Sequence, residues 1–196
     1  MTRVCLIGEA GSNLQYELLS RETAREALAT YDLERPFENS LALRTVSVGA
    51  AVSLLNDLNW YCTRFVDEAF VREPSISDDE WLSRALATRL RNGEIEADET
   101  GEFCKIYGLE RVVPAVDDEV DTPDTAAASG TDESTTTSEG GENEAAAASS
   151  GAGGGPTYRL VEPLYVRRTD GELPEYDLRD VAETLVVRLT EAEYTP

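Results

Sequence analysis

The first half of the chain alternates short apolar runs with segments in which apolar residues recur every three or four positions. The run 3–7 is apolar and ends at Gly8, so it predicts a buried strand. Residues 21–31 place four apolar side chains on one helical face, and 41–48 is rich in strand-forming residues and ends at Gly49. We therefore expect a helix between two strands.

The segment 50–72 carries an ambiguous pattern. Its apolar residues recur at intervals of three and four, which favours one long amphipathic helix. The part 60–66, taken alone, is also compatible with a strand. We expect the helix, and we leave open whether 59–70 is helix or strand.

A helix with clear end signals is expected next. Ser77 and Glu80 form a capping-box pattern shortly after Pro74, leucines then recur every four residues, and Asn92-Gly93 ends the segment. The sequence therefore predicts that this helix begins at the capping box.

Three strands are predicted in the rest of the chain. Residues 103–113 end at Pro114, 158–168 are strand-like, and 184–189 alternate apolar with other residues. Pro163 lacks an N–H group, so it implies an edge strand or a bulge. The last two strands are too few to be stable alone, and we expect them to complete the sheet begun by the first part.

Between these parts lies an acidic segment, 115–157, rich in Ala, Ser, Thr and Gly. It contains ten acidic residues and no basic one, and it has almost no large apolar side chain to bury. We predict a disordered linker here and a single split domain made of 1–114 and 158–196. The expected fold class is α+β, with one small mixed or antiparallel sheet and about three helices.

Three stretches, 17–28, 52–61 and 161–171, resemble a small haloarchaeal family of unknown function. The resemblance covers both ordered parts and not the linker. Because that family has no assigned activity, the resemblance implies a cytoplasmic location and a split domain, and it implies nothing about mechanism.

The excess of acidic residues indicates the kind of cytoplasm in which the protein works. The chain has 17 basic and 39 acidic residues, a formal net charge of −22, and Lys105 as its single lysine. Because −12 lies outside the linker, the composition favours a protein of a salt-accumulating cytoplasm, where dense salt screens like charges. The alternative is an ordinary acidic protein with an acidic segment. No apolar run is long enough to span a bilayer, so no membrane association is expected.

The absence of histidine excludes several catalytic sites. A Ser-His-Asp triad, a Cys-His dyad and a His-ligated zinc site all need it. The cysteines Cys5, Cys62 and Cys104 form no Cys-x-x-Cys pair and lie in apolar patterns, so we expect them to be buried, free and not required. No cofactor and no metal is expected, and no catalytic residue is assigned.

Two sets of residues have a chemical and a structural interpretation. The loop Gly8–Ser12 follows a strand, as phosphate-binding loops do, but it lacks their spacing and their lysine, which favours a plain turn. Neighbouring carboxylates are candidates for Mg²⁺ ligands or acid–base groups. In so acidic a chain we expect instead a solvated helix face with a Glu68–Arg72 ion pair, and helix capping. These carboxylates are Asp67, Glu68 and Glu73, and Asp78, Asp79 and Glu80.

Arginine and tyrosine gather in the C-terminal part. Such a sheet face stacks single-stranded RNA in some proteins, whereas pairing with the chain's own carboxylates, such as Glu162, is the favoured interpretation. We expect a non-enzymatic interaction or regulatory module with an unknown protein partner. The alternatives are an RNA- or nucleotide-binding protein and a small carboxylate- and metal-dependent enzyme. The candidate contact residues are Tyr158, Arg159, Tyr165, Arg167, Arg168 and Arg188.

Overall fold

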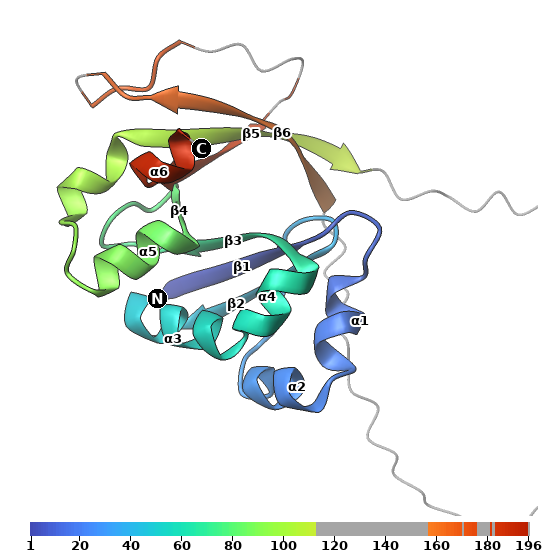
Figure 1. The fold of residues 1–196 in the computed structure, drawn as a ribbon. Helices are drawn as coiled ribbons and strands as arrows, with labels where there is room; N and C mark the ends of the chain where they lie inside the picture. The colour runs from blue at the N-terminus through green and yellow to red at the C-terminus, as the bar shows by residue number, and fades with distance from the viewer. Residues whose placement is uncertain (113–156, 170, 176–180, 182, 196) are drawn as a thin grey trace, which may run out of the picture. The chain divides into compact units, whose positions relative to one another are not determined.

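A computed structural model describes residues 1–112, 157–169, 171–175, 181 and 183–195. The predicted linker lies outside these residues, except for Thr157, the first residue of β6. Within the described part, seven strands form one mixed sheet in the order β2-β1-β3-β4-β7-β5-β6 (Figure 1). The strands are β1 (Thr2–Gly8), β2 (Ser40–Thr45), β3 (Val66–Arg72), β4 (Trp81–Ser83), β5 (Phe103–Val112), β6 (Thr157–Arg167) and β7 (Glu183–Leu189).

Helices accompany the N-terminal strands and end the chain. The described residues contain α1 (Leu14–Leu19), α2 (Glu22–Leu28), α3 (Val48–Asp57), α4 (Asn59–Phe65), α5 (Arg84–Arg91) and α6 (Glu191–Tyr194), with a 3₁₀ turn at Ala97–Gly101. The predicted α+β class with one sheet is therefore confirmed. The six helices are short, and they are more numerous than the three expected.

The C-terminal strands lie within the sheet. Strand β7 pairs in parallel with β4 and antiparallel with β5, while every other neighbouring pair of the sheet is antiparallel. Strand β6 is an edge strand, and its pairing with β5 shifts register opposite Pro163, between Ile106 and Gly108. The expectation of an edge or a bulge at Pro163 is confirmed on both counts.

One face of β2, β1 and β3 is covered by helices. Side chains alternate across a strand, so Leu6, Leu43 and Val71 point to this face, where each is at most 1% exposed. They pack against apolar residues of α1 to α5, including Leu18 and Leu55. Figure 1 shows α1 to α4 on this side of the strands. The larger apolar core of the molecule lies here.

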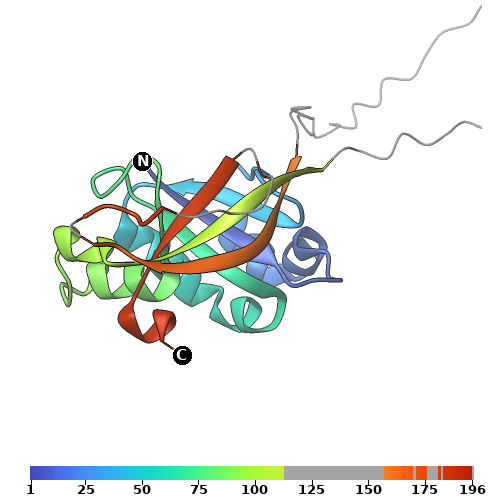
Figure 2. The same ribbon diagram turned by 90° about the horizontal axis from the view of Figure 1, so that it is seen from above.

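The opposite face of the same strands is covered by the sheet itself. Cys5 and Phe70 point away from the helices and pack with Tyr107 of β5 and Val187 of β7. In Figure 2, β5, β6 and β7 lie across the N-terminal strands. The backbone N–H of Glu38, ahead of β2, donates to the carbonyl of Tyr158 on β6 at 2.7 Å. The sheet therefore curls into an almost closed, concave surface.

The expectation of one long helix over 50–72 is wrong. Helix α3 ends at Asp57, α4 ends at Phe65, and β3 follows at once. Strand β3 pairs with the side of β1 that β2 leaves open. The pairing runs from Arg72 opposite Arg3 to Val66 opposite Gly8. Pairing along a whole strand outweighs the helical spacing of the apolar residues. The open segment 59–70 is thus helix in its first half and strand in its second.

The expectation of a helix beginning at Ser77 is also wrong. Ser77 Oγ accepts from the N–H of Glu80 at 3.1 Å, as a cap does, but Trp81–Ser83 continues as β4. Trp81 pairs with Val187, so the C-terminal strand draws these residues into the sheet. The helix begins at Arg84, where Ser83 is the N-cap.

The cysteines lie as expected. Cys5, Cys62 and Cys104 are all buried and free. Burial raises the pKa of Cys5 to about 12 and that of Cys104 to about 11, so both remain thiols at neutral pH. No helix of the described residues is long and apolar enough to cross a membrane.

Candidate functional site

A cavity of about 520 Å³ opens at one end of the concave surface. That volume falls in the range of small-molecule sites. It brings together segments that are far apart in the sequence, namely the loop after β1, the residues before β2, the start of β3, the middle of β5 and the bulged part of β6. Its walls are formed by Ile7 and Gly8, 10–12, 38–39, 67–68, Tyr107 and 159–163.

Glu68 and Tyr107 form the floor of this cavity, and Lys105 lies behind them, so that the three side chains make one polar triad. Alternation along β5 places Lys105 and Tyr107 on the concave face, and Glu68 of β3 faces them. The Lys105 ammonium forms an ion pair with Glu68, and the Tyr107 hydroxyl donates to the same carboxylate oxygen at 2.9 Å. Lys105 is only 5% exposed. Its ammonium also lies 5.3 Å from the centre of the Tyr107 ring, within the range of a cation–π contact.

The Tyr107 hydroxyl of the triad stays protonated. Burial raises the pKa of Tyr107, and the charge of Glu68 together with its hydrogen bond raises it further. The phenol therefore remains protonated and acts as a donor. The predicted Glu68–Arg72 ion pair is wrong, because β3 is a strand in which Glu68 pairs with Lys105. Arg72 instead stacks on the Trp81 ring at 5.1 Å.

Asn39 holds the loop that forms one wall. Its backbone adopts the left-handed conformation, with φ 48°, which asparagine tolerates better than most residues. Its carbonyl accepts from the N–H of Gly8, its side-chain oxygen accepts from the N–H of Leu14, and its amide donates to the carbonyl of Glu9. A Cβ at Gly8 would lie 2.4 Å from the Asn39 amide nitrogen, so only glycine fits there. The loop Gly8–Ser12 is thus a turn that is held in place by hydrogen bonds to Asn39 and that lines the cavity.

The structure separates the C-terminal arginine and tyrosine candidates. Arg159 lies at the cavity, where it pairs with Glu110 at 2.7 Å and with Glu38 at 3.9 Å. Tyr158 donates to Glu183 at 3.4 Å, and Tyr165 is 47% exposed. Arg167 pairs with Glu102 at the far end of β6. The arginines bond to carboxylates of the chain, as the favoured interpretation expects, and none of the described pairs involves Glu162.

Arg168 and Arg188 form a second polar cluster with Glu80. Both guanidinium groups bond to the Glu80 carboxylate, and Arg188 also donates to the hydroxyl of Thr100 at 2.9 Å. Burial alone raises the pKa of Glu80, but the hydrogen bonds from the two arginines outweigh it and hold the pKa below its usual value. The role of Glu80 is therefore ion pairing and not helix capping.

The predicted carboxylate groups do not converge as metal ligands do. Within the residues that the structure describes, no group of three or more Cys, Asp or Glu side chains is placed to hold a metal ion. Glu73 accepts from Thr2 and caps the turn at Ser75, away from the cavity. Asp67 and Glu68 do line the cavity, together with Glu38 and Glu162.

Sequence reasoning missed Asn39, Lys105 and Tyr107 as site residues. A signal for two of them exists, since Lys105 is the only lysine and strand alternation places it on one face with Tyr107. No comparable signal marks Asn39. Its partners Gly8 and Leu14 lie 31 and 25 positions earlier, and only the fold brings them to it.

Comparison with known proteins gives a family but no activity. No curated protein and no solved structure matches the chain. A family model matches residues 2–109, more than half of the chain, and this range includes Gly8, Glu68 and the Lys105–Tyr107 strand. The cavity residues of β6 lie outside the matched range. On the strength of that match, the chain belongs to the family of unknown function DUF5804.

Proposed function

We propose that the protein is a non-enzymatic interaction or regulatory module that binds a small polar molecule in the cavity on its concave face. The observation that carries this proposal is the floor of the cavity. An ion pair between Glu68 and Lys105, completed by Tyr107, lies where five separate segments meet. A ligand that contacts all of these segments links them, and so it favours one arrangement of the sheet over others.

The arrangement of the arginines favours this function over RNA binding. Stacking of bases needs arginine and aromatic side chains that are free to meet them. Arg159, Arg167, Arg168 and Arg188 each bond to a carboxylate of the chain. An RNA that stacks on these arginines would first have to break the pairs. The dispersed carboxylates give no specific support to a metal-dependent enzyme.

The proposed setting is a salt-rich cytoplasm of the kind that haloarchaea have. The composition supports it, because acidic residues exceed basic ones outside the segment 115–157 as well. At 1 M salt the screening length is about 3 Å, so repulsion between surface carboxylates is small. We expect the melting temperature to rise clearly between about 0.1 M and about 2 M KCl. An equal melting temperature at the two salt concentrations would contradict the proposed setting.

Thermal shift with a library of small polar metabolites tests the ligand site. A ligand at one hundred times its Kd stabilises the protein by about 2.7 kcal/mol, which corresponds to a rise of about 5–10 °C in Tm. We expect such a rise for the parent protein and its loss in Ala10→Trp, where the indole fills the cavity. Ala29→Trp, at the exposed end of α2, is the matched control and should keep the rise. If no compound stabilises the protein, or if Ala10→Trp responds like the parent, the proposal is wrong.

A further inference from the structure

Carboxylates dominate the charged groups around the cavity. Glu38, Asp67, Glu68 and Glu162 line it, against Arg159 as the one basic lining residue among those described. The Arg159 guanidinium is already held by Glu110 and Glu38. The ammonium of Lys105, behind the floor, is held by Glu68. The interior therefore favours positive charge and disfavours phosphate or carboxylate ligands.

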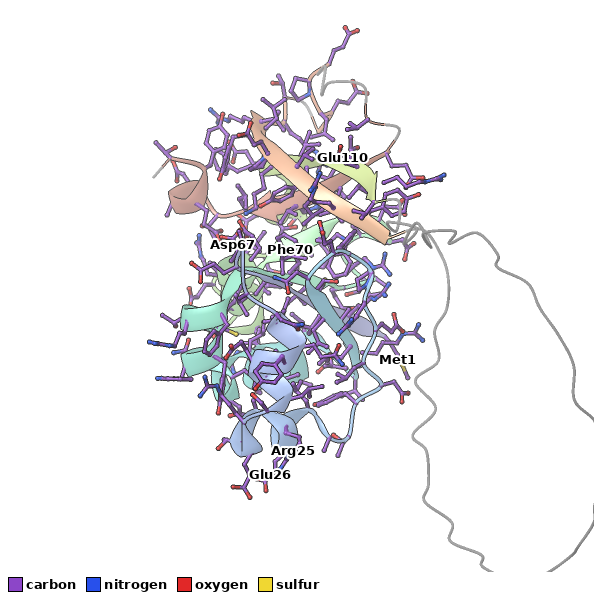
Figure 3. The ribbon with its side chains drawn as sticks, turned by 90° about the vertical axis from the view of Figure 1, so that its right-hand side faces the viewer. Met1, Arg25, Glu26, Asp67, Phe70 and Glu110 are labelled. Atoms are coloured by element: carbon purple, nitrogen blue, oxygen red, sulfur yellow. The ribbon has the colours of Figure 1, made fainter. Side chains whose placement is uncertain are left out.

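Two of these carboxylates have no basic partner. In the described part of the chain, neither Asp67 nor Glu162 takes part in an ion pair, in contrast to Glu38 and Glu68. Asp67 lies close enough to the Tyr107 hydroxyl for its charge to contribute to the raised pKa of that group. Figure 3 shows Asp67 and Phe70 between the helical side and the strand that carries Glu110, with Arg25 and Glu26 far away on α2. Asp67 is exposed and lines the cavity without an ion-pair partner, so its carboxylate is free to bind a cation.

The walls between the charges are partly apolar. Ile7, Leu160, Val161 and Pro163 line the same space as the carboxylates. A Ca²⁺ or Mg²⁺ site needs six or more oxygen atoms that converge on one point, and the described carboxylates do not converge in this way. A cavity of about 520 Å³ with separated charges and apolar walls fits a longer molecule.

We infer that the cavity takes an organic cation, an aliphatic amine with ammonium groups at the ends of a short hydrocarbon chain. The ammonium groups bond to Asp67 and Glu162, and the methylene groups lie against Leu160 and Pro163. This inference rests on the proposed function, because it names the chemical class of the ligand for that site. The charge of the ligand, and not only its size, then decides whether it binds.

Matched probes of one shape and three charges test the inference. Isothermal titration in about 1 M KCl compares 1,4-diaminobutane with butane-1,4-diol and with succinate. The same comparison is repeated with an eight-carbon diamine, diol and dicarboxylate, in case the two carboxylates of the cavity are matched by a longer molecule. We expect at least one diamine to bind, and we expect the diol and the dicarboxylate of the same length to bind about tenfold more weakly or not at all.

Paired variants assign the effect to the cavity. The double variant Asp67→Asn with Glu162→Gln keeps the shape of both side chains, and we expect it to weaken diamine binding about tenfold or more. The control Glu26→Gln with Asp32→Asn removes the same charge from exposed positions at or near α2, and it should bind within about twofold of the parent. Melting curves of all variants verify that each is folded.

The outcomes separate the two proposals. Binding of a dicarboxylate or a diol as tight as that of the diamine overturns the cation inference but leaves a ligand site in the cavity. Diamine binding that the control pair weakens as much as the Asp67 and Glu162 pair reflects net charge alone and also overturns it. If no diamine binds while a library compound stabilises the protein through the cavity, the inference fails and the proposed function stands. If neither a diamine nor a library compound acts through the cavity, both fail.

Discussion

The two faces of β1, β2 and β3 are built from the same strands and have opposite character. On the helical face the inward side chains are apolar, as Leu6, Leu43 and Val71 illustrate, except for Thr2 and Thr45 at one end of the β1–β2 ladder. On the concave face Cys5 and Phe70 share the interior with a lysine, a glutamate and a tyrosine. The helical face therefore resembles an ordinary core, whereas the concave face includes polar groups that a core built for stability alone does not need.

The energetic logic of the two faces differs accordingly. Apolar burial stabilises through area and tolerates many arrangements of similar volume. A buried ion pair stabilises little in itself, but its loss leaves an uncompensated charge, so it makes one arrangement much better than its alternatives. The contrast teaches that both faces bury apolar area, the helical face more of it, and that the polar groups of the concave face favour one arrangement over others.

The largest expected effect comes from removing the cover of the concave face. A chain that ends at Pro114 lacks β6 and β7, and β7 is the strand that joins β4 to β5. Strand β5 then has no neighbour in the sheet, and Phe70 and Trp81 lose the side chains of β7 that cover them. We expect an aggregating or partly unfolded product in size-exclusion chromatography and circular dichroism. A soluble monomer with a cooperative melt would show that 1–114 is a domain on its own.

Shortening the chain between β5 and β6 is the matched control. Val112 and Thr157 are register partners, so a short loop made of 113–116, a Gly/Ser bridge and Pro156 can connect them as a hairpin. Loop-closure entropy changes by only about 0.6 kcal/mol for each doubling of length. Replacing 117–155 by such a bridge should therefore leave the cooperative melt within a few degrees of the parent.

A smaller loss is expected from a cavity on the helical face. Leu6 is 1% exposed and sits among helix residues, so Leu6→Ala should lower the free energy of unfolding by about 2–5 kcal/mol. Urea unfolding at high KCl measures it. Leu164→Ala, at a side chain that is 37% exposed on β6, should cost less than about 1 kcal/mol. Equal losses in the two variants would contradict the assignment of the main core to the helical face.

Breaking the ion pair of the concave face should cost less than that. Lys105→Met preserves length and leaves the Glu68 carboxylate half-buried without its cation, for an expected loss of about 1–3 kcal/mol in the free energy of unfolding. Adding Glu68→Gln to this variant removes the uncompensated charge, so the double variant should recover part of the loss. No recovery in the double variant would show that packing of the lysine stem, and not its charge, is what matters.

Much of this contrast is invisible in the sequence, for physical reasons. Alternation and turn residues predict β5, β6 and β7 because those signals are local. The end of α4 and the whole of β4 depend on pairing with β1 and with β7, more than a hundred residues away in the second case, so helical spacing predicts them wrongly. The cavity is even more difficult to predict from the sequence. Glu68 is one of many carboxylates, and nothing local marks it, because its partner Lys105 lies 37 positions further along the chain.

The smallest effect concerns the cluster of Glu80, Arg168 and Arg188. Arg188 follows Val187 in β7 and so points to the opposite face of that strand from the concave interior. The pKa of Glu80 is lower in the folded protein than its usual value of 4.5, so its contribution to stability is complete above that pH and is lost as the pH falls through the folded value. Between pH 6 and pH 3.5 the parent should therefore lose more unfolding free energy than Glu80→Gln does. Parallel pH profiles would contradict this role.

The pairing of Val112 with Thr157 has a consequence for engineering and for evolution. The chain leaves β5 and re-enters β6 at two backbone positions that face each other across one ladder. A foreign domain whose own termini lie close together can occupy that point without pulling the strands apart. A chain cut there becomes two fragments, 1–112 and 157–196, whose strands interleave in the sheet because β7 lies between β4 and β5. The fold is thus suited to a split-protein reporter, in which association of the two fragments completes the sheet.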